Sequence, residues 1–91
     1  MIALTDRFGP WADDIDRAER LARLRSMRAI VRLATGPRGE ALANELHRAE
    51  RDASRLPFAL AALDHLAPLD RRQILASYAA LHRPQTEART A

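Results

Sequence analysis

A short breaking segment, Thr35-Gly36-Pro37-Arg38-Gly39, constrains the fold of this chain more than any other feature. Two glycines that flank a proline within five residues interrupt any helix. Apolar residues at helical spacing run up to Ala34, and the pattern resumes at Glu40. The break therefore predicts a helical hairpin, in which the helix before residue 35 packs against the helix after residue 39.

The residues available for a core favour helices over strands. The chain has nineteen Ala and thirteen Leu, but one Val and four aromatic residues. Ala and Leu head the helix scale, whereas strands depend on β-branched and aromatic side chains. We therefore predict an all-α protein, a small bundle of about four helices with a long hairpin and two shorter helices. Residues 1–84 would form one domain, and residues 85–91 a flexible polar tail.

Local signals place the helix boundaries. Pro10 suits the first turn of a helix, so the first helix is expected to open there. Asp70 reads as an N-cap, with Leu69 stapled onto Ile74 inside the fourth helix. The third helix is apolar on all sides and is expected in the interior. The four predicted helices cover residues 9–34, 40–55, 57–67 and 70–84.

The apolar spacing of the first two helices predicts contacts on several sides. One stripe of the first helix contains Trp11, Ile15, Ala18, Ala22 and Ala29, and a second contains Leu24, Met27, Val31 and Ala34. Alanine buries little area, and thin cores often gain stability by oligomerising, so we expect a homo-oligomer, most simply a dimer. The second stripe can pack within the chain or between chains. The predicted oligomer interface consists of Leu24, Met27, Val31, Leu42, Leu46, Ala49 and Ala53.

Arginines gather on the first helix. Residues 17–38 contain seven arginines against one acid, Glu19, a local charge of +6 (seven minus one) in a chain of net charge +3. Rows of guanidinium groups suit phosphates, which they bind bidentately. This clustering predicts a non-enzymatic accessory protein that contacts a nucleic-acid backbone. The predicted binding residues are Arg17, Arg20, Arg25, Arg28, Arg32 and Arg38, with Arg17, Arg25, Arg28 and Arg32 within about one quadrant of the helix.

Two alternatives to this interpretation remain open. The arginines can cover apolar surface and pair with Glu40, Glu45 and Glu50 of the returning helix, or they can meet an acidic protein surface. The chain would then be a protein-interaction module, an adaptor or an inhibitor. The Gly36–Gly39 segment could hold a phosphate before a helix, but without a preceding strand it reads as a plain turn.

No pattern of catalytic or metal-binding residues stands out. Cysteine is absent, and His47, His65 and His82 lack the spacing of metal ligands. The serines occupy no nucleophile elbow, so we expect neither an enzyme nor a cofactor. No apolar run approaches the ~18 residues of a membrane span, and the N-terminus does not resemble a secretory signal. We therefore expect a cytoplasmic protein with no membrane partner.

Overall fold

The computed structural model describes residues 9–82, which form helices and turns and contain no strand. The α-helices are α1 (Arg17–Thr35), α2 (Glu40–Arg51), α3 (Leu56–Asp64) and α4 (Pro68–His82). Two short 3-10 helices, η1 (Gly36–Gly39) and η2 (Ala53–Arg55), join α1 to α2 and α2 to α3. The all-helical class and the break after Thr35 are confirmed. Residues 83–91, which include the predicted polar tail, lie outside the described residues.

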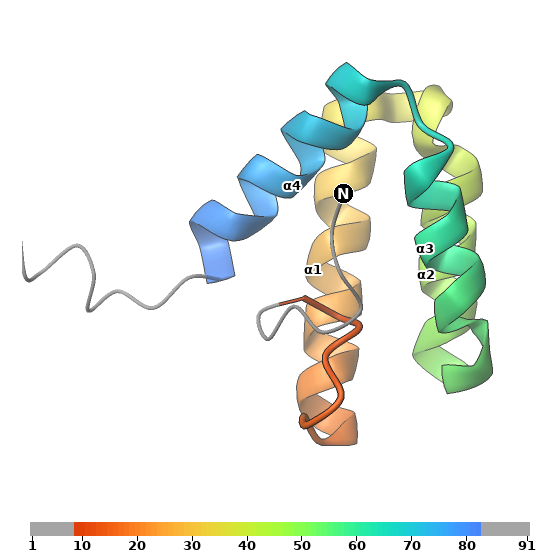
Figure 1. Ribbon diagram of the computed structural model, residues 1–91, viewed down its shortest axis with the longest axis vertical. Helices are drawn as coiled ribbons and strands as arrows, with labels where there is room; N and C mark the ends of the chain where they lie inside the picture. Colours follow the sequence, from red (N-terminus) through yellow and green to blue (C-terminus); the bar gives the residue numbers. More distant parts are fainter. Residues whose placement is uncertain (1–8, 83–91) are drawn as a thin grey trace, which may run out of the picture.

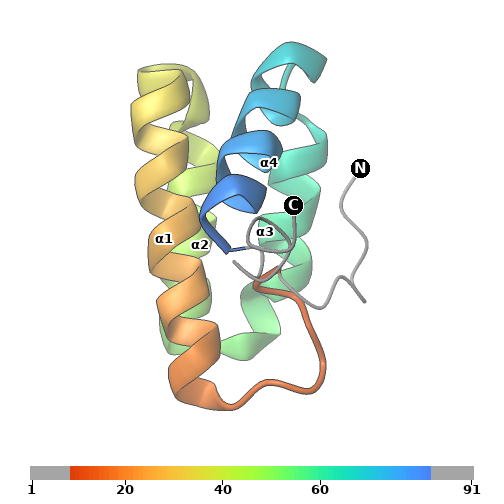
Figure 2. The same cartoon turned by 90° about the vertical axis from the view of Figure 1, so that its left-hand side faces the viewer.

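The helices pack as a hairpin with two additions. α1 and α2 lie antiparallel, α3 runs back along α2, and α4 crosses α1 obliquely (Figures 1 and 2). Residues 9–16 run beside α1 before the chain enters it (Figure 1). The core lies among α1, α2, α3 and α4.

The start of α1 differs from the prediction. The carboxylate of Asp16 accepts a hydrogen bond of 2.8 Å from the Glu19 backbone N–H, which makes Asp16 the N-cap. A cap of this kind satisfies an otherwise unpaired donor of the first turn. The expected helical start at Pro10 is wrong, and Trp11 belongs to the segment before the helix. The Asp16-x-x-Glu19 spacing carried this signal in the sequence.

Three further boundaries were predicted wrongly, and one of them is the end of α3, which lies at Asp64 and not at residue 67. α2 ends at Arg51 because Asp52 is extended, and its side chain caps the following turn at Ser54. α4 begins at Pro68, so Asp70 lies in its first turn and is not the N-cap. Leu69 is 70% exposed and forms no staple over Ile74. At the end of α2 a side-chain contact stopped the helix before the apolar periodicity ended, whereas at the start of α4 a proline opened the helix two residues before the expected cap.

Helix α3 is less buried than its composition predicts. It packs along α2, and only Ala59 and Leu63 of the helix are buried, whereas Phe58 is 53% exposed. The guanidinium carbon of Arg55 lies 4.2 Å from the centroid of the Phe58 ring, a cation–π contact that covers one ring face. A helix that packs mainly against α2 buries only one of its faces, whatever its composition.

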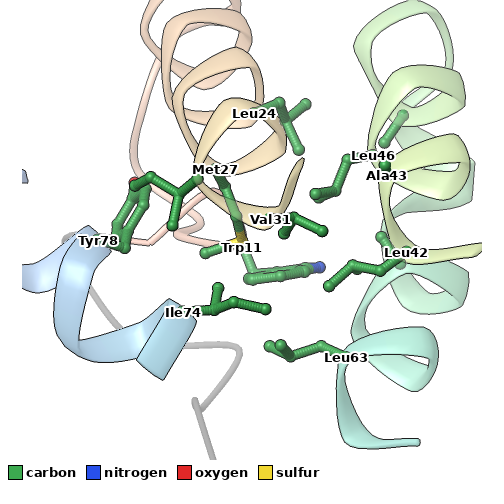
Figure 3. Close-up of a cluster of buried hydrophobic side chains, with 13 residues drawn as sticks. Trp11, Leu24, Met27, Val31, Leu42, Ala43, Leu46, Leu63, Ile74 and Tyr78 are labelled. Atoms are coloured by element: carbon green, nitrogen blue, oxygen red, sulfur yellow. The ribbon is translucent and has the colours of Figure 1, made fainter. Parts of the chain in front are cut away.

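The core is built around Trp11 (Figure 3). Its indole Nε1 donates a hydrogen bond of 2.8 Å to the Leu56 carbonyl, so the polar edge of a buried ring is satisfied. Buried aliphatic side chains from α1, α2, α3 and α4 surround it, among them Leu42, Leu63 and Ile74. A residue outside the helices thus fills the space that the alanine-rich helices leave.

Candidate anion-binding surface

The seven arginines of residues 17–38 do not form one free row. Arg20 donates from Nη1 to the Pro10 carbonyl at 2.7 Å, and Arg23 donates from Nη1 to the Gly9 carbonyl at 3.1 Å. Arg23 also pairs with Glu19 at 2.8 Å. These two arginines hold residues 9–10 against α1. Arg20, predicted as a binding residue, therefore has a structural contact that the sequence pattern did not reveal.

Arg25 and Arg28 share one carboxylate of α2. Arg25 Nε lies 3.4 Å from Glu50 Oε1, and Arg28 Nε lies 3.2 Å from Glu50 Oε2. The Glu50 side chain is only 8% exposed, whereas that of Arg25 is 62% exposed. Pairing with Glu50 was one of the alternatives open from the sequence. Burial of the acid does not bury Arg25, whose guanidinium group still reaches solvent.

Arg28 has a second partner on α2. Its Nη1 lies at hydrogen-bonding distance from His47 Nδ1. Because a guanidinium group only donates, Nδ1 of His47 must accept. Glu50 Oε2 is within ion-pair distance of Arg28 but is buried with no aligned hydrogen-bond donor. Arg28 is thus anchored, and the carboxylate retains one unused acceptor.

Three exposed arginines on this side of the hairpin have no polar side-chain contact within residues 9–82. Arg17 and Arg32 are on α1, and Arg51 is at the end of α2. Arg17 and Arg32 lie on the same side of α1 as Arg25 and Arg28, and all four positions fall within about one quadrant of the helix. The four α1 residues, hereafter the basic face, are Arg17, Arg25, Arg28 and Arg32.

Arg38 joins η1 to α4 through an ion pair with Asp70, hereafter the clamp. Its Nε and Nη2 donate to the two carboxylate oxygens of Asp70, each at 3.0 Å. This bidentate pair lowers the pKa of Asp70 below its ordinary value and raises that of Arg38. The predicted anion-binding role of Arg38 thus competes with a partner in its own chain. The two residues are 32 positions apart, and no local pattern links them.

We expect Asp70→Asn to lower the melting temperature slightly at neutral pH, because it removes the carboxylate from an exposed ion pair. Since the pKa of folded Asp70 is lowered, its contribution is complete above the ordinary carboxyl pKa. It is lost as the pH falls through the lower pKa of the folded state, so the difference from the unsubstituted protein should shrink in acid. Thermal melts across that range test this, with exposed Asp14→Asn as the matched control. A difference that persists at low pH would contradict the clamp.

The other acids of α2 lie away from the basic face. Glu45 pairs with Arg55 at 2.9 Å and with Arg48 at 3.5 Å, toward the α3 side of the hairpin. Glu40 is exposed and forms no ion pair within the described residues. Of the three predicted glutamate partners, Glu50 alone contacts arginines of α1. The basic face therefore carries four arginines against one acid.

The predicted oligomer interface lies largely within one chain. Six of its seven residues are at most 4% exposed, and the seventh, Ala53, is exposed. The six buried residues are Leu24, Met27, Val31, Leu42, Leu46 and Ala49. The hairpin of a single chain covers them, so the second stripe of the first helix finds its partner on α2 and α4. Ala18, Ala22 and Ala29, from the other predicted stripe, are exposed.

A groove opens where the start of α1 meets the end of α2. Its volume is about 450 Å³. The lining residues are Arg17, Arg20, Leu21, Leu24, Ala49, Glu50, Arg51, Asp52 and Ala53. Three cationic side chains from two helices thus surround a partly apolar floor. The groove adjoins the basic face through Arg17 and Glu50.

Residues 9–82 contain no group of three or more histidine and acidic side chains placed to hold a metal ion. Within the same range, no helix has both the length and the apolar character needed to cross a bilayer. Comparison of the chain with protein-family models, with curated proteins and with solved structures finds no match.

Proposed function

We propose that this protein binds the phosphate backbone of a nucleic acid through the basic face of α1. The observation that carries the proposal is the solvent access of these guanidinium groups. Arg17 and Arg32 are exposed without polar partners within the described residues, and Arg25 remains 62% exposed beside Glu50. Arg20 and Arg38, which bind other parts of the chain, are left out of the proposed surface.

The spacing of the basic face suits an extended polyanion. At a helical rise of about 1.5 Å per residue, Arg17 and Arg25 lie about 12 Å apart along α1, and Arg25 and Arg32 about 10 Å apart. A row of this length spans several phosphates of one strand, which are about 3.4 Å apart along the duplex axis. Such contacts position a protein on a nucleic acid without identifying bases, so we expect weak sequence preference.

Glu50 limits the affinity of the basic face for a phosphate backbone. Arg25 and Arg28 already share its buried carboxylate, which neutralises one of the four positive charges. A phosphate must therefore share these arginines with Glu50, whereas it meets Arg17 and Arg32 unopposed. We expect modest affinity that depends strongly on ionic strength, because each neutralised phosphate releases bound counterions.

Replacing Arg25 and Arg32 together with glutamine should flatten the slope of log affinity against log salt by about two, roughly one per lost phosphate contact. Arg28 is kept in this variant because its loss would leave the buried Glu50 without its less exposed partner. Fluorescence anisotropy with duplex and single-stranded oligonucleotides measures the slope. Arg48→Gln with Arg72→Gln is the control of equal charge, since Arg48 pairs with Glu45 and Arg72 is on α4.

The fold of the Arg25→Gln, Arg32→Gln variant should be retained, because exposed ion pairs contribute only ~0–1 kcal/mol each. A salt slope that falls equally in the control would assign the effect to net charge and contradict a specific surface. Absence of binding to either oligonucleotide at low salt would refute the proposed function.

A specific observation favours a protein partner as the second candidate. Leu33 is 89% exposed beside Arg32 on α1. A protein surface would cover this apolar side chain, whereas a phosphate backbone would not. The Leu33→Ser variant distinguishes the two candidate functions. It should leave the affinity for oligonucleotides unchanged, and it should weaken the binding of an acidic protein that covers the leucine.

A further inference from the structure

The groove between α1 and α2 has unsatisfied positive charge. Arg17 and Arg51, from different helices, both line it without polar partners in residues 9–82. Neither of its two acids forms an ion pair with Arg17 or Arg51 within the described residues. Asp52 accepts hydrogen bonds from the Ser54 N–H and hydroxyl, and Glu50 is paired with arginines outside the groove. The groove therefore presents two available guanidinium groups to an anion.

The remaining surface of the groove narrows the chemistry of a ligand. Leu21, Leu24, Ala49 and Ala53 provide an apolar floor. The Glu50 Oε2 atom is buried beside Arg28 and does not face a ligand in the groove. A matching ligand has an anionic group and a flat or apolar part. The groove volume of about 450 Å³ lies within the ordinary range of small-molecule sites, ~300–1,000 Å³.

We propose that this groove binds a nucleotide through its terminal phosphate monoester, with the base over the apolar floor. The nucleotide is either the phosphorylated end of a strand or a free nucleoside monophosphate. For the strand end, the inference rests on the proposed backbone-binding function.

The pair of arginines favours a phosphate over a carboxylate. A phosphate monoester has three free oxygens and can engage two guanidinium groups bidentately, whereas a carboxylate has only two oxygens to share between them. A monoester also carries about −1.5 to −2 charges at neutral pH, against −1 for each internal phosphodiester. The groove should therefore prefer a phosphorylated strand end to a hydroxyl end of the same sequence.

Anisotropy with paired single-stranded oligonucleotides, one 5′-phosphorylated and one 5′-hydroxyl, tests the groove. We expect the phosphorylated strand to bind about fivefold more tightly, which corresponds to about 1 kcal/mol. Arg51→Gln should reduce this preference below about twofold and leave the affinity for the hydroxyl strand nearly unchanged. Arg32→Gln is the matched control, because it should weaken both strands equally and keep the preference. A nucleoside monophosphate should compete with the phosphorylated strand, and the unphosphorylated nucleoside should not.

The outcomes separate the two proposals. Salt-dependent binding with no preference for the 5′-phosphate refutes the groove assignment and leaves backbone binding intact. Binding of the free nucleoside monophosphate that is lost in Arg51→Gln supports the groove even if neither strand binds through the basic face. Competition by a peptide with a free terminal carboxylate, and not by the nucleotide, would assign the groove to a protein end and overturn the proposal. Unchanged circular dichroism of the variants excludes unfolding as the cause of lost binding.

Discussion

Trp11→Ala is expected to cost about 3–5 kcal/mol of folding free energy, the usual cost of truncating a large buried aromatic side chain. Trp11 is 3% exposed and lies among Val31, Leu42 and Ile74 (Figure 3). Domains of this size have total stabilities on the order of 5–14 kcal/mol, so much of the margin would be lost. Each 1 kcal/mol shifts the melting temperature by about 4–8 °C at this length, which predicts a fall of more than about 12 °C.

Thermal melts followed by circular dichroism measure this effect. Phe58→Ala is the control, because Phe58 is also aromatic but 53% exposed, and its loss should have a much smaller effect. Trp11→Phe should fall in between, since it keeps most of the ring volume and removes the hydrogen bond to Leu56. Equal melting temperatures for Trp11→Ala and Phe58→Ala would show that Trp11 does not form the centre of the core.

The second large effect is expected at Gly39, where Gly39→Ala should destabilise the fold by about 1–3 kcal/mol through overpacking. A Cβ atom there would overlap Thr35 Oγ1 and lie 2.7 Å from Val31 Cγ1. The Thr35 hydroxyl cannot move away freely, because it donates a hydrogen bond of 2.6 Å to the Val31 carbonyl. The close contact between η1 and the last turn of α1 therefore requires glycine at position 39.

A double-mutant cycle identifies the cause. In a Thr35→Ala background, Gly39→Ala should cost clearly less, because the overlapping oxygen has been removed. Gly36→Ala differs in mechanism: a Cβ atom at Gly36 would meet nothing within 4 Å, but the φ of +56° disfavours any residue with a Cβ. Its cost should be unaffected by Thr35→Ala. Denaturant unfolding at equilibrium measures all of these differences, and additive effects of Gly39→Ala and Thr35→Ala would contradict the overlap.

The parts of the fold that depend on local interactions were predictable. Alanine and leucine dominate the apolar residues, so helix formation followed from intrinsic propensity. The break at residues 35–39 followed from backbone restrictions on glycine and proline. The spacing of Leu24, Met27 and Val31 identified side chains that the structure buries. Such patterns are readable because each depends on residues a few positions apart.

The boundaries were less predictable because competing local signals overlapped. Pro10 suggested a helix start, while Asp16, with Glu19 three residues later, provided the real cap. The apolar seam continued past Arg51, but the Asp52 side chain bound Ser54 and ended the helix. Apolar periodicity reports which face can be buried, and it does not report where a side chain will compete with the backbone for hydrogen bonds.

The sequence by itself determined that this chain is helical, where its hairpin turns, and that its arginines are concentrated before that turn. Only the tertiary structure decided which of those arginines remain available. Arg38 reaches Asp70 and Arg25 reaches Glu50 because packing of α4 and α2 against α1 brings residues 32 and 25 positions apart into contact. Long charged side chains pair according to helix rotation and the depth of packing, neither of which local periodicity specifies. The same packing created the groove beside Arg17 and Arg51, which no spacing in the chain indicates.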